Sequence, residues 1–178
     1  MATKLSVYNN ALVEHLGERK VTLTEPRKSR RVLDTIWDSG FVKGCLEDGQ
    51  WNFATVSVVI DFDPDIVTDS GLKYAFTKPT DWVRTIALCS DQYYKNNILD
   101  YEDEDENIYS DEQSIYMKYI SDGASYGGDL ANWPQSFTEY AETKLASKAA
   151  MSITQDRELQ VLLIQKADKA LSKARSKD

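Results

Sequence analysis

The stretch that decides the fold is residues 134–178, PQSFTEYAETKLASKAAMSITQDRELQVLLIQKADKALSKARSKD. After Pro134 it contains no glycine or proline, so nothing in it breaks a helix by conformation alone. Apolar residues recur at helical spacing in two blocks. The first block is Phe137, Ala141, Leu145 and Ala149, and the second is Leu159, Leu162, Leu163, Ala167, Ala170, Leu171 and Ala174. We expect two long helices with a corner at Ile153–Thr154, where Thr154 is the predicted N-cap of the second.

Two further helices are predicted near the start of the sequence. Leu5, Tyr8, Leu12 and Leu16 share one helical face, which predicts a helix over residues 4–16. A second helix is predicted from Pro26 to about Asp48, because proline is tolerated in a first turn.

Gly40 and Gly44 lie one turn apart on the apolar face of this second helix. Each glycine costs up to about 1 kcal/mol relative to alanine inside a helix, so the pair needs an explanation. Either another backbone approaches closely there, or the helix is irregular or broken near Gly40. The sequence does not distinguish these two readings.

The middle of the chain has a different pattern. Short β-branched or aromatic runs at 56–60 and 72–76 are bounded by Asp, Pro and Gly, which is typical of strands. Thr80–Asp81 predicts the cap of a short helix through about Ser90. A small antiparallel sheet is expected from residues 98–102, 107–110 and 114–120.

These elements predict an α+β fold that is mainly α. We expect one domain over residues 1–178, in which a helical bundle comes from about 4–54 and 133–178 and ends in a long C-terminal helix. A small antiparallel β-rich region at about 55–132 is inserted into it.

The charge is unevenly distributed along the chain. The net charge of −8 argues against general affinity for nucleic acid, because phosphates are repelled. Eight acidic and no basic side chains lie between Ile98 and Met117, and we expect the hairpin tip of Asp103, Glu104, Asp105 and Glu106 to form one contact surface. The cationic end of the last helix predicts a second, formed by Lys166, Lys169, Lys173, Arg175 and Lys177. The apolar face there narrows from leucine to alanine, so we expect the final turns to bury little in their own domain.

No residue pattern predicts an enzyme, a metal site or a cofactor. The only histidine, His15, lies between Leu12 and Leu16, which is typical of the edge of a core rather than of a catalyst. Cys45 and Cys89 lack metal-site spacing, and we expect them to be free and reduced. Two converging carboxylates of a glycan hydrolase are left open as an alternative, since no pair is singled out.

The acidic run resembles a calcium loop only in part. Asp103, Asp105 and Asn107 occupy the first three ligand positions of an EF-hand, but Ile108 and Ser114 stand where that loop needs glycine and glutamate. A solvated hairpin tip is the favoured interpretation. The tyrosines at 93, 94, 109, 116, 119 and 126 add to the interface character of this region, because tyrosine is enriched at protein interfaces.

Three stretches together resemble a known family. They are ALVEHLGERKVTLTEPRKSRRVLDTIWDSGFVKGCLEDGQWNFA at 11–54, YAFTKPTDWVRTIAL at 74–88 and NWPQSFTEYAETKLASKAA at 132–150. In order and spacing they are similar to the tail tubular protein A family, the head-to-tail adaptors (connectors) of tailed bacteriophages.

The resemblance implies a structural protein of the virion neck. It implies a ring of about twelve copies under the portal protein, with a tail or nozzle protein below and DNA passing through the centre. It implies no catalytic residues, and the C-terminal helix would face the portal. Another neck or tail-completion protein is the nearest alternative. No secretory signal or membrane-spanning run is apparent, so we expect assembly in a host cytoplasm and no membrane partner.

Overall fold

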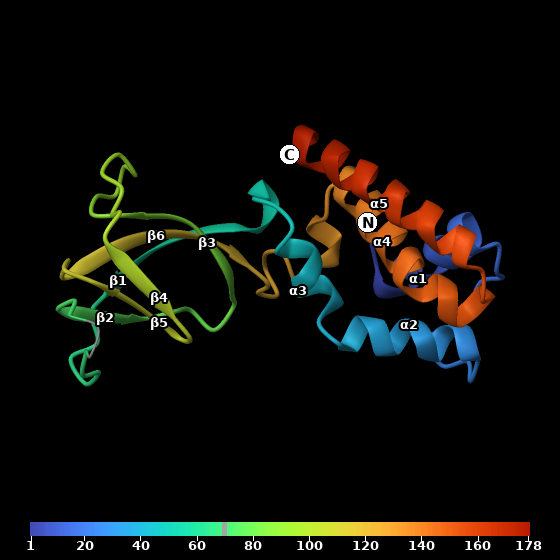
Figure 1. Cartoon of the computed structure of the whole chain (residues 1–178), viewed down its shortest axis with the longest axis horizontal. Helices are drawn as coiled ribbons and strands as arrows, with labels where there is room; N and C mark the ends of the chain where they lie inside the picture. Colours follow the sequence, from blue (N-terminus) through green and yellow to red (C-terminus); the bar gives the residue numbers. More distant parts are fainter. Residues whose placement is uncertain (69–70) are drawn as a thin grey trace.

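The computed structural model describes residues 1–68 and 71–178 and has an α+β fold, with 44% helix and 20% strand. Helices gather at one end of an elongated molecule and strands at the other (Figure 1). Both chain ends lie among the helices (Figure 1). The middle of the sequence therefore forms a β region that projects from a helical region.

The helical region is organised around α4 (Gln135–Thr154) and α5 (Arg157–Lys177), which form an antiparallel hairpin. Gln155 ends α4 in the left-handed conformation, with φ of 59°. The Asp156 carboxylate then accepts a hydrogen bond of 3.0 Å from the Leu159 amide. The predicted two helices are confirmed, but the N-cap is Asp156 rather than Thr154. The chain turns two residues later than expected, and the Thr154 hydroxyl instead donates to the Ala150 carbonyl.

The first predicted helix is also confirmed. It consists of α1 (Lys4–Asn10) and a π-helical continuation η1 (Ala11–His15). Thr3 and Ser6 form a reciprocal capping box at its start. Gly17, with φ of +65°, follows its end. Both segments pack against α4.

The predicted helix over residues 26–48 is wrong as a single element. The chain forms α2 (Lys28–Asp38) and α3 (Phe41–Leu46), and Gly40 between them adopts φ of +89°. A Cβ atom at Gly40 or Gly44 would meet no atom within 4 Å outside the local helix. No neighbouring backbone therefore requires these glycines, and the reading of a break near Gly40 is confirmed.

The β region contains two three-stranded antiparallel sheets. The first has the order β1–β6–β3 and the second β2–β5–β4. Their bounds are β1 (Thr55–Asp61), β2 (Tyr74–Thr77), β3 (Trp82–Cys89), β4 (Tyr101–Glu104), β5 (Asn107–Ser110) and β6 (Ser114–Ser121). β1, β5 and β6 lie at the predicted residues, and β2 and β4 are shifted by one to three residues along the chain. The sheet predicted from 98–102, 107–110 and 114–120 is wrong, because β6 pairs with β1 and β3 rather than with β5.

The short helix predicted over residues 80–90 is wrong, because this segment is β3. Its residues Trp82, Val83, Thr85 and Ile86 are aromatic or β-branched and suit a pleated sheet. Pairing with β6 supplies the hydrogen bonds that a local helix would otherwise make, with Leu88 opposite Met117. Tertiary pairing thus overrides the capping signal of Thr80–Asp81.

Each region has its own apolar core. Phe76, Leu88, Ile108, Ile115, Met117 and Tyr119 form the buried cluster of the β region. The helical core is built around Trp51, Phe137 and Tyr140, and Val83 and Ile120 from the sheet reach into it. The Trp133 indole donates to the Gly127 carbonyl at 2.9 Å, where the chain leaves the β region. Apolar contact and this hydrogen bond join the two regions.

Gly40→Ala and Gly44→Ala form a matched pair that tests the helix break. Gly40→Ala forces an L side chain to positive φ, so we expect a loss of more than about 1 kcal/mol in the free energy of unfolding. Gly44 is helical, and alanine there should gain about 0.5–1 kcal/mol. Urea denaturation measures both. Equal losses at the two positions would contradict this account and would indicate close packing around both glycines.

Candidate functional site

Two neighbouring cavities of the helical region lie along α4. A cavity of about 380 Å³ separates α4 from the α2–α3 break, and a second of about 220 Å³ separates it from α5. Lys144 and Lys148 of α4 line both cavities. We call the combined surface the α4 groove, with these two lysines as its floor. Its residues are Ile36, Ser39, Gly40, Phe41, Lys43, Gly44, Glu47, Asp48, Tyr140, Lys144, Ser147, Lys148, Ile164, Ala167, Asp168 and Leu171.

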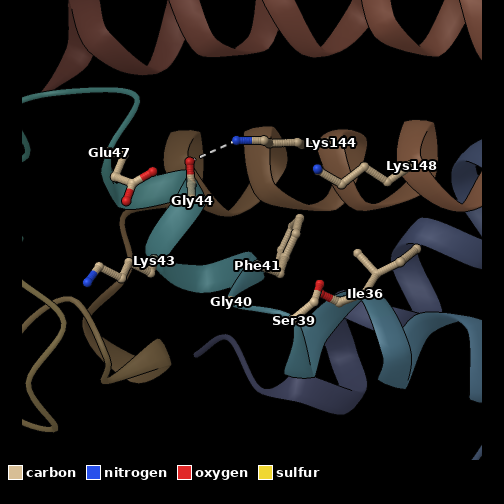
Figure 2. Close-up of a pocket in the computed structure, with 9 residues that line it drawn as sticks. All are labelled: Ile36, Ser39, Gly40, Phe41, Lys43, Gly44, Glu47, Lys144 and Lys148. Carbon is tan, nitrogen blue, oxygen red and sulfur yellow. Dashed lines mark hydrogen bonds between the residues drawn. The ribbon is translucent and has the colours of Figure 1, made fainter.

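Apolar side chains form the two walls of the groove. Ile36 and Phe41 contribute on the α2–α3 side, and Ile164 and Leu171 on the α5 side. Figure 2 shows the Lys144 amine directed at the Gly44 carbonyl and Lys148 extending along α4 above the Phe41 ring, while the amine of Lys43 points away. Ile164 is 47% exposed although it is a large aliphatic residue. An apolar wall beside a basic floor suits a ligand surface that is both apolar and acidic.

The two floor lysines have different environments. The Lys144 ammonium forms an ion pair with the Asp48 carboxylate and donates to the Gly44 carbonyl at 2.9 Å. Asp48 also accepts a hydrogen bond from the Tyr140 hydroxyl, and burial is the main reason that the pKa of Tyr140 is raised. Lys148 is exposed and has no ion-pair or hydrogen-bond partner among residues 1–68 and 71–178. Lys144 is thus a structural residue, and Lys148 is a free cation in the groove.

The cationic end of α5 is held by its own chain more firmly than predicted. Lys173 pairs with Glu139 at 2.8 Å, and the Arg175 guanidinium donates to the Asp48 carbonyl at 2.8 Å. Asp178 accepts a hydrogen bond of 2.7 Å from the Asn52 amide, and Ala174 is fully buried. The expectation that the final turns bury little is confirmed, because from Ser172 to Lys177 only Ala174 is buried and the other five residues are exposed.

The five predicted basic residues therefore fall into two groups. Lys173 and Arg175 hold α5 in place. Lys166, Lys169 and Lys177 are exposed and form no ion pair within the described part of the chain. The apolar face predicted for this helix is buried at Leu163, Ala167 and Ala174, but Leu162 is 48% exposed.

The predicted acidic hairpin exists and is formed by β4 and β5. Every residue from Tyr101 to Glu106 is exposed, and Asp105 adopts φ of +47° in the turn. The Lys78 ammonium pairs with Asp103, and it lies 4.3 Å from the centroid of the Trp82 ring. Glu102, Glu104 and Glu106 form no ion pair with any described residue. Among the described residues no three His, Cys, Asp or Glu side chains are grouped so as to hold a metal ion.

The tyrosines of the β region divide between core and surface. Tyr119 is buried, and burial together with its hydrogen bond to Asp81 raises its pKa. The Tyr94 hydroxyl donates to the Met117 carbonyl at 3.3 Å beneath Lys118. Tyr93 and Tyr126 are 71% and 40% exposed. Of the predicted interface tyrosines, these two are the most exposed.

His15, Cys45 and Glu142 are titratable groups that lie in the packed interior of the helical region. His15 is half-buried, with its Nε2 atom 3.4 Å from the Thr143 hydroxyl, and burial and Lys166 lower its pKa. Burial raises the pKa of Cys45 to about 12. Glu142 is 8% exposed and accepts a hydrogen bond of 2.7 Å from the Asn10 amide group. Burial raises the pKa of Glu142, but this carboxyl lies against α1 rather than in the groove.

A scan against protein-family models and a search of curated proteins both found no match for this chain. Within the described residues, no helix has the length and apolar character needed to cross a lipid bilayer.

Lys144→Met and Lys148→Met test the division of roles in the groove floor. Lys144→Met leaves the Asp48 carboxylate without its cation, and we expect a loss of about 1–3 kcal/mol in the free energy of unfolding. Lys148→Met removes an exposed charge that is unpaired among the described residues, and it should change the free energy of unfolding by less than about 0.5 kcal/mol. Urea denaturation of both variants measures this, and similar losses would refute the assignment.

Glu142→Gln tests the buried carboxyl through its pH dependence. The pKa of Glu142 in the folded state lies above its unfolded value of 4.5. Between these two pKa values the folded state binds more protons than the unfolded state, so the free energy of unfolding falls as pH rises through this range. The glutamine variant should therefore be more stable than the parent at pH 7, and the difference should vanish below about pH 4.

Glu139→Gln is the control for this experiment. The hydrogen bond from Lys173 lowers the pKa of Glu139, so its contribution is present at neutral pH and is lost as pH falls. Glu139→Gln should accordingly be less stable than the parent at pH 7. Denaturation midpoints measured from pH 3 to pH 8 compare the two variants, and shifts of the same sign would overturn the assignment.

Proposed function

We propose that this protein is a structural head-to-tail adaptor of a tailed bacteriophage, one subunit of a ring beneath the portal. The resemblance of residues 11–54, 74–88 and 132–150 to tail tubular protein A carries the proposal, because the three stretches are spread over much of the chain and keep the same order. The architecture supports it. Helices from both parts of the sequence pack together, and the residues between them form the β sheets, as a helical bundle with a β-rich insertion requires.

The properties of the candidate surfaces also favour a protein that acts by contact. The α4 groove has apolar walls and a free lysine, and the acidic hairpin presents carboxylates without internal partners. Neither surface places an acid, a base and a nucleophile together. The carboxyl with a raised pKa, Glu142, is covered by α1, which disfavours a carboxylate-dependent glycan hydrolase because a glycan would not reach it.

In this proposal α5 faces the portal. Lys166, Lys169 and Lys177 supply cationic contacts, while Lys173 and Arg175 keep the end of the helix on its own subunit. A single contact can be weak, because the other members of a closed ring act at high effective concentration. The acidic hairpin of Asp103 to Glu106 faces the lumen or the tail side, where repulsion of phosphate lets DNA pass without adhering.

Charge reversal on α5 tests the adaptor function. Purified protein is mixed with rings of a portal protein from the same genome, and binding is followed by sedimentation. We expect the parent to bind the portal rim and Lys166→Glu/Lys169→Glu to bind at least about tenfold more weakly, since each reversal places like charges together.

The control reverses two exposed lysines elsewhere, Lys20→Glu/Lys28→Glu, and should bind like the parent. Circular dichroism checks that both variants are folded. Failure of the parent to bind the portal would overturn the proposal, and glycan turnover lost on changing two specific carboxylates would favour the hydrolase. Binding to a different neck protein would favour the other structural alternative.

A further inference from the structure

The two regions of the molecule have opposite net charge. Residues 55–132 contain sixteen acidic and five basic side chains, a net charge of −11. The rest of the chain contains thirteen acidic and sixteen basic side chains, a net charge of +3. The β region of one copy is therefore attracted to the helical region of another, and like regions repel each other.

Two aliphatic side chains of the β region are nearly bare, Val67 at 84% exposure and Leu99 at 88%. Leu99 is 88% exposed and is followed by Asp100, by Tyr101 at 38% exposure and by Glu102. We call residues 99–102 the Leu99 tip. A leucine this exposed is poorly explained by folding, because its burial would yield about 1.5–3 kcal/mol. Leu99 gains this stabilisation only when an apolar surface of another chain covers it.

The Leu99 tip is held in place by the backbone before it. The Ile98 amide donates to the Leu88 carbonyl at 2.8 Å, and Asn97 forms a β-bridge with Cys89. The Asp91 carboxylate accepts hydrogen bonds from the amides of Tyr93, Lys95 and Asn96, which fixes the preceding loop. Leu99 is therefore presented from a preordered segment, which lowers the entropy cost of docking.

The α4 groove has the complementary properties. Its walls include Ile36 and the half-exposed Ile164, which match an aliphatic side chain. Lys148 lies on its floor without an acidic partner among the described residues, which matches a carboxylate. Glu47 and Asp168 also line the groove, so Lys148 and the apolar walls rather than a uniformly basic surface select the ligand.

We propose that the α4 groove of one subunit receives the Leu99 tip of a second copy of this chain. Leu99 packs between the apolar walls, and Asp100 or Glu102 pairs with Lys148. In one copy the loop between β3 and β4 lies far from the helical region, so the contact joins different copies (Figure 1). Two different surfaces meet, which makes the contact head-to-tail and allows many copies to join in a ring. This inference rests on the proposed function and names the subunit interface within it.

Cross-linking of mixed variants, each with one added cysteine, tests the interface directly. Leu99→Cys and Lys148→Cys proteins are mixed and treated with a short bismaleimide, with and without portal rings. Native Cys45 and Cys89 are buried and remain as a constant background. We expect cross-linked dimers in the mixture but not in either variant alone. A mixture of Leu99→Cys with Lys20→Cys is the matched control and should give none.

A charge exchange then tests the role of Lys148. In a mixture of Leu99→Cys and Ile164→Cys proteins, adding Lys148→Glu to the second should reduce the dimer yield about tenfold, because like charges then meet. Adding Asp100→Lys and Glu102→Lys to the first should restore it.

Any of the following outcomes would overturn the inference. No cross-link with or without portal shows that the groove is not a subunit interface, and dimers of Leu99→Cys alone show that like surfaces meet. Attachment of Lys148→Cys to the portal shows that the portal occupies the groove. If the adaptor function holds but this inference fails, the parent still binds portal rings in sedimentation. If portal binding fails, the adaptor proposal falls whatever the cross-linking shows.

Discussion

The burial of α4 on nearly every side is the constraint on which the rest of the structure depends. α1, η1, α2 and α5 all pack against it, and more than half of its residues are buried. Small residues such as Ala141, Ala146 and Ala149 let these neighbours approach closely. Phe137 supplies the bulk at one end, with ring centroids of Trp51 and Trp133 each 4.8 Å away. A helix that is buried all round needs covering by several elements, so the rest of the helical region is arranged around it.

The groove lies where the covering of α4 is incomplete. Lys144 and Lys148 are one turn apart on the side that no helix fully covers, where the break at Gly40 sets α3 at a different angle from α2 (Figure 1). A straight helix over residues 26–48 would have no such break. The positive φ of Gly40 and the ion pair between Lys144 and Asp48 therefore fix the shape of this surface together. Lys148 is left as the free charge because Asp48 is already satisfied by Lys144 and Tyr140.

Local sequence predicted a helix or strand correctly where its residues all favoured the same secondary structure. The absence of glycine and proline after Pro134 predicted α4 and α5, and β-branched runs predicted β1 and β6. Prediction failed where distant residues decide between local options. Val83, Thr85 and Ile86 become a strand because β6 is available for pairing, and the cap moved to Asp156 because Gln155 adopts a left-handed turn. The break at Gly40 was left open, since local sequence does not reveal whether a second backbone lies nearby.

The candidate surfaces were predictable only in part, because charge in a sequence does not show which charges are already paired. The acidic run was visible, but the anchoring of Asp103 by Lys78 was not. The groove was not predicted. Ile164, which lines it, lies outside the apolar face predicted for the last helix, and this position was a usable signal.

The edge position of β4 limits how this acidic surface can be used. An exposed edge strand can add a strand from another chain, and charged side chains oppose such pairing. β4 is the outer strand of the order β2–β5–β4, and Glu102, Asp103 and Glu104 on it are all exposed. Edge-to-edge pairing of two copies would bring these carboxylates together and is disfavoured. Association at this edge is therefore favoured through side chains directed at a surface of opposite charge, and Leu99, directly before β4, is an exposed apolar side chain placed there.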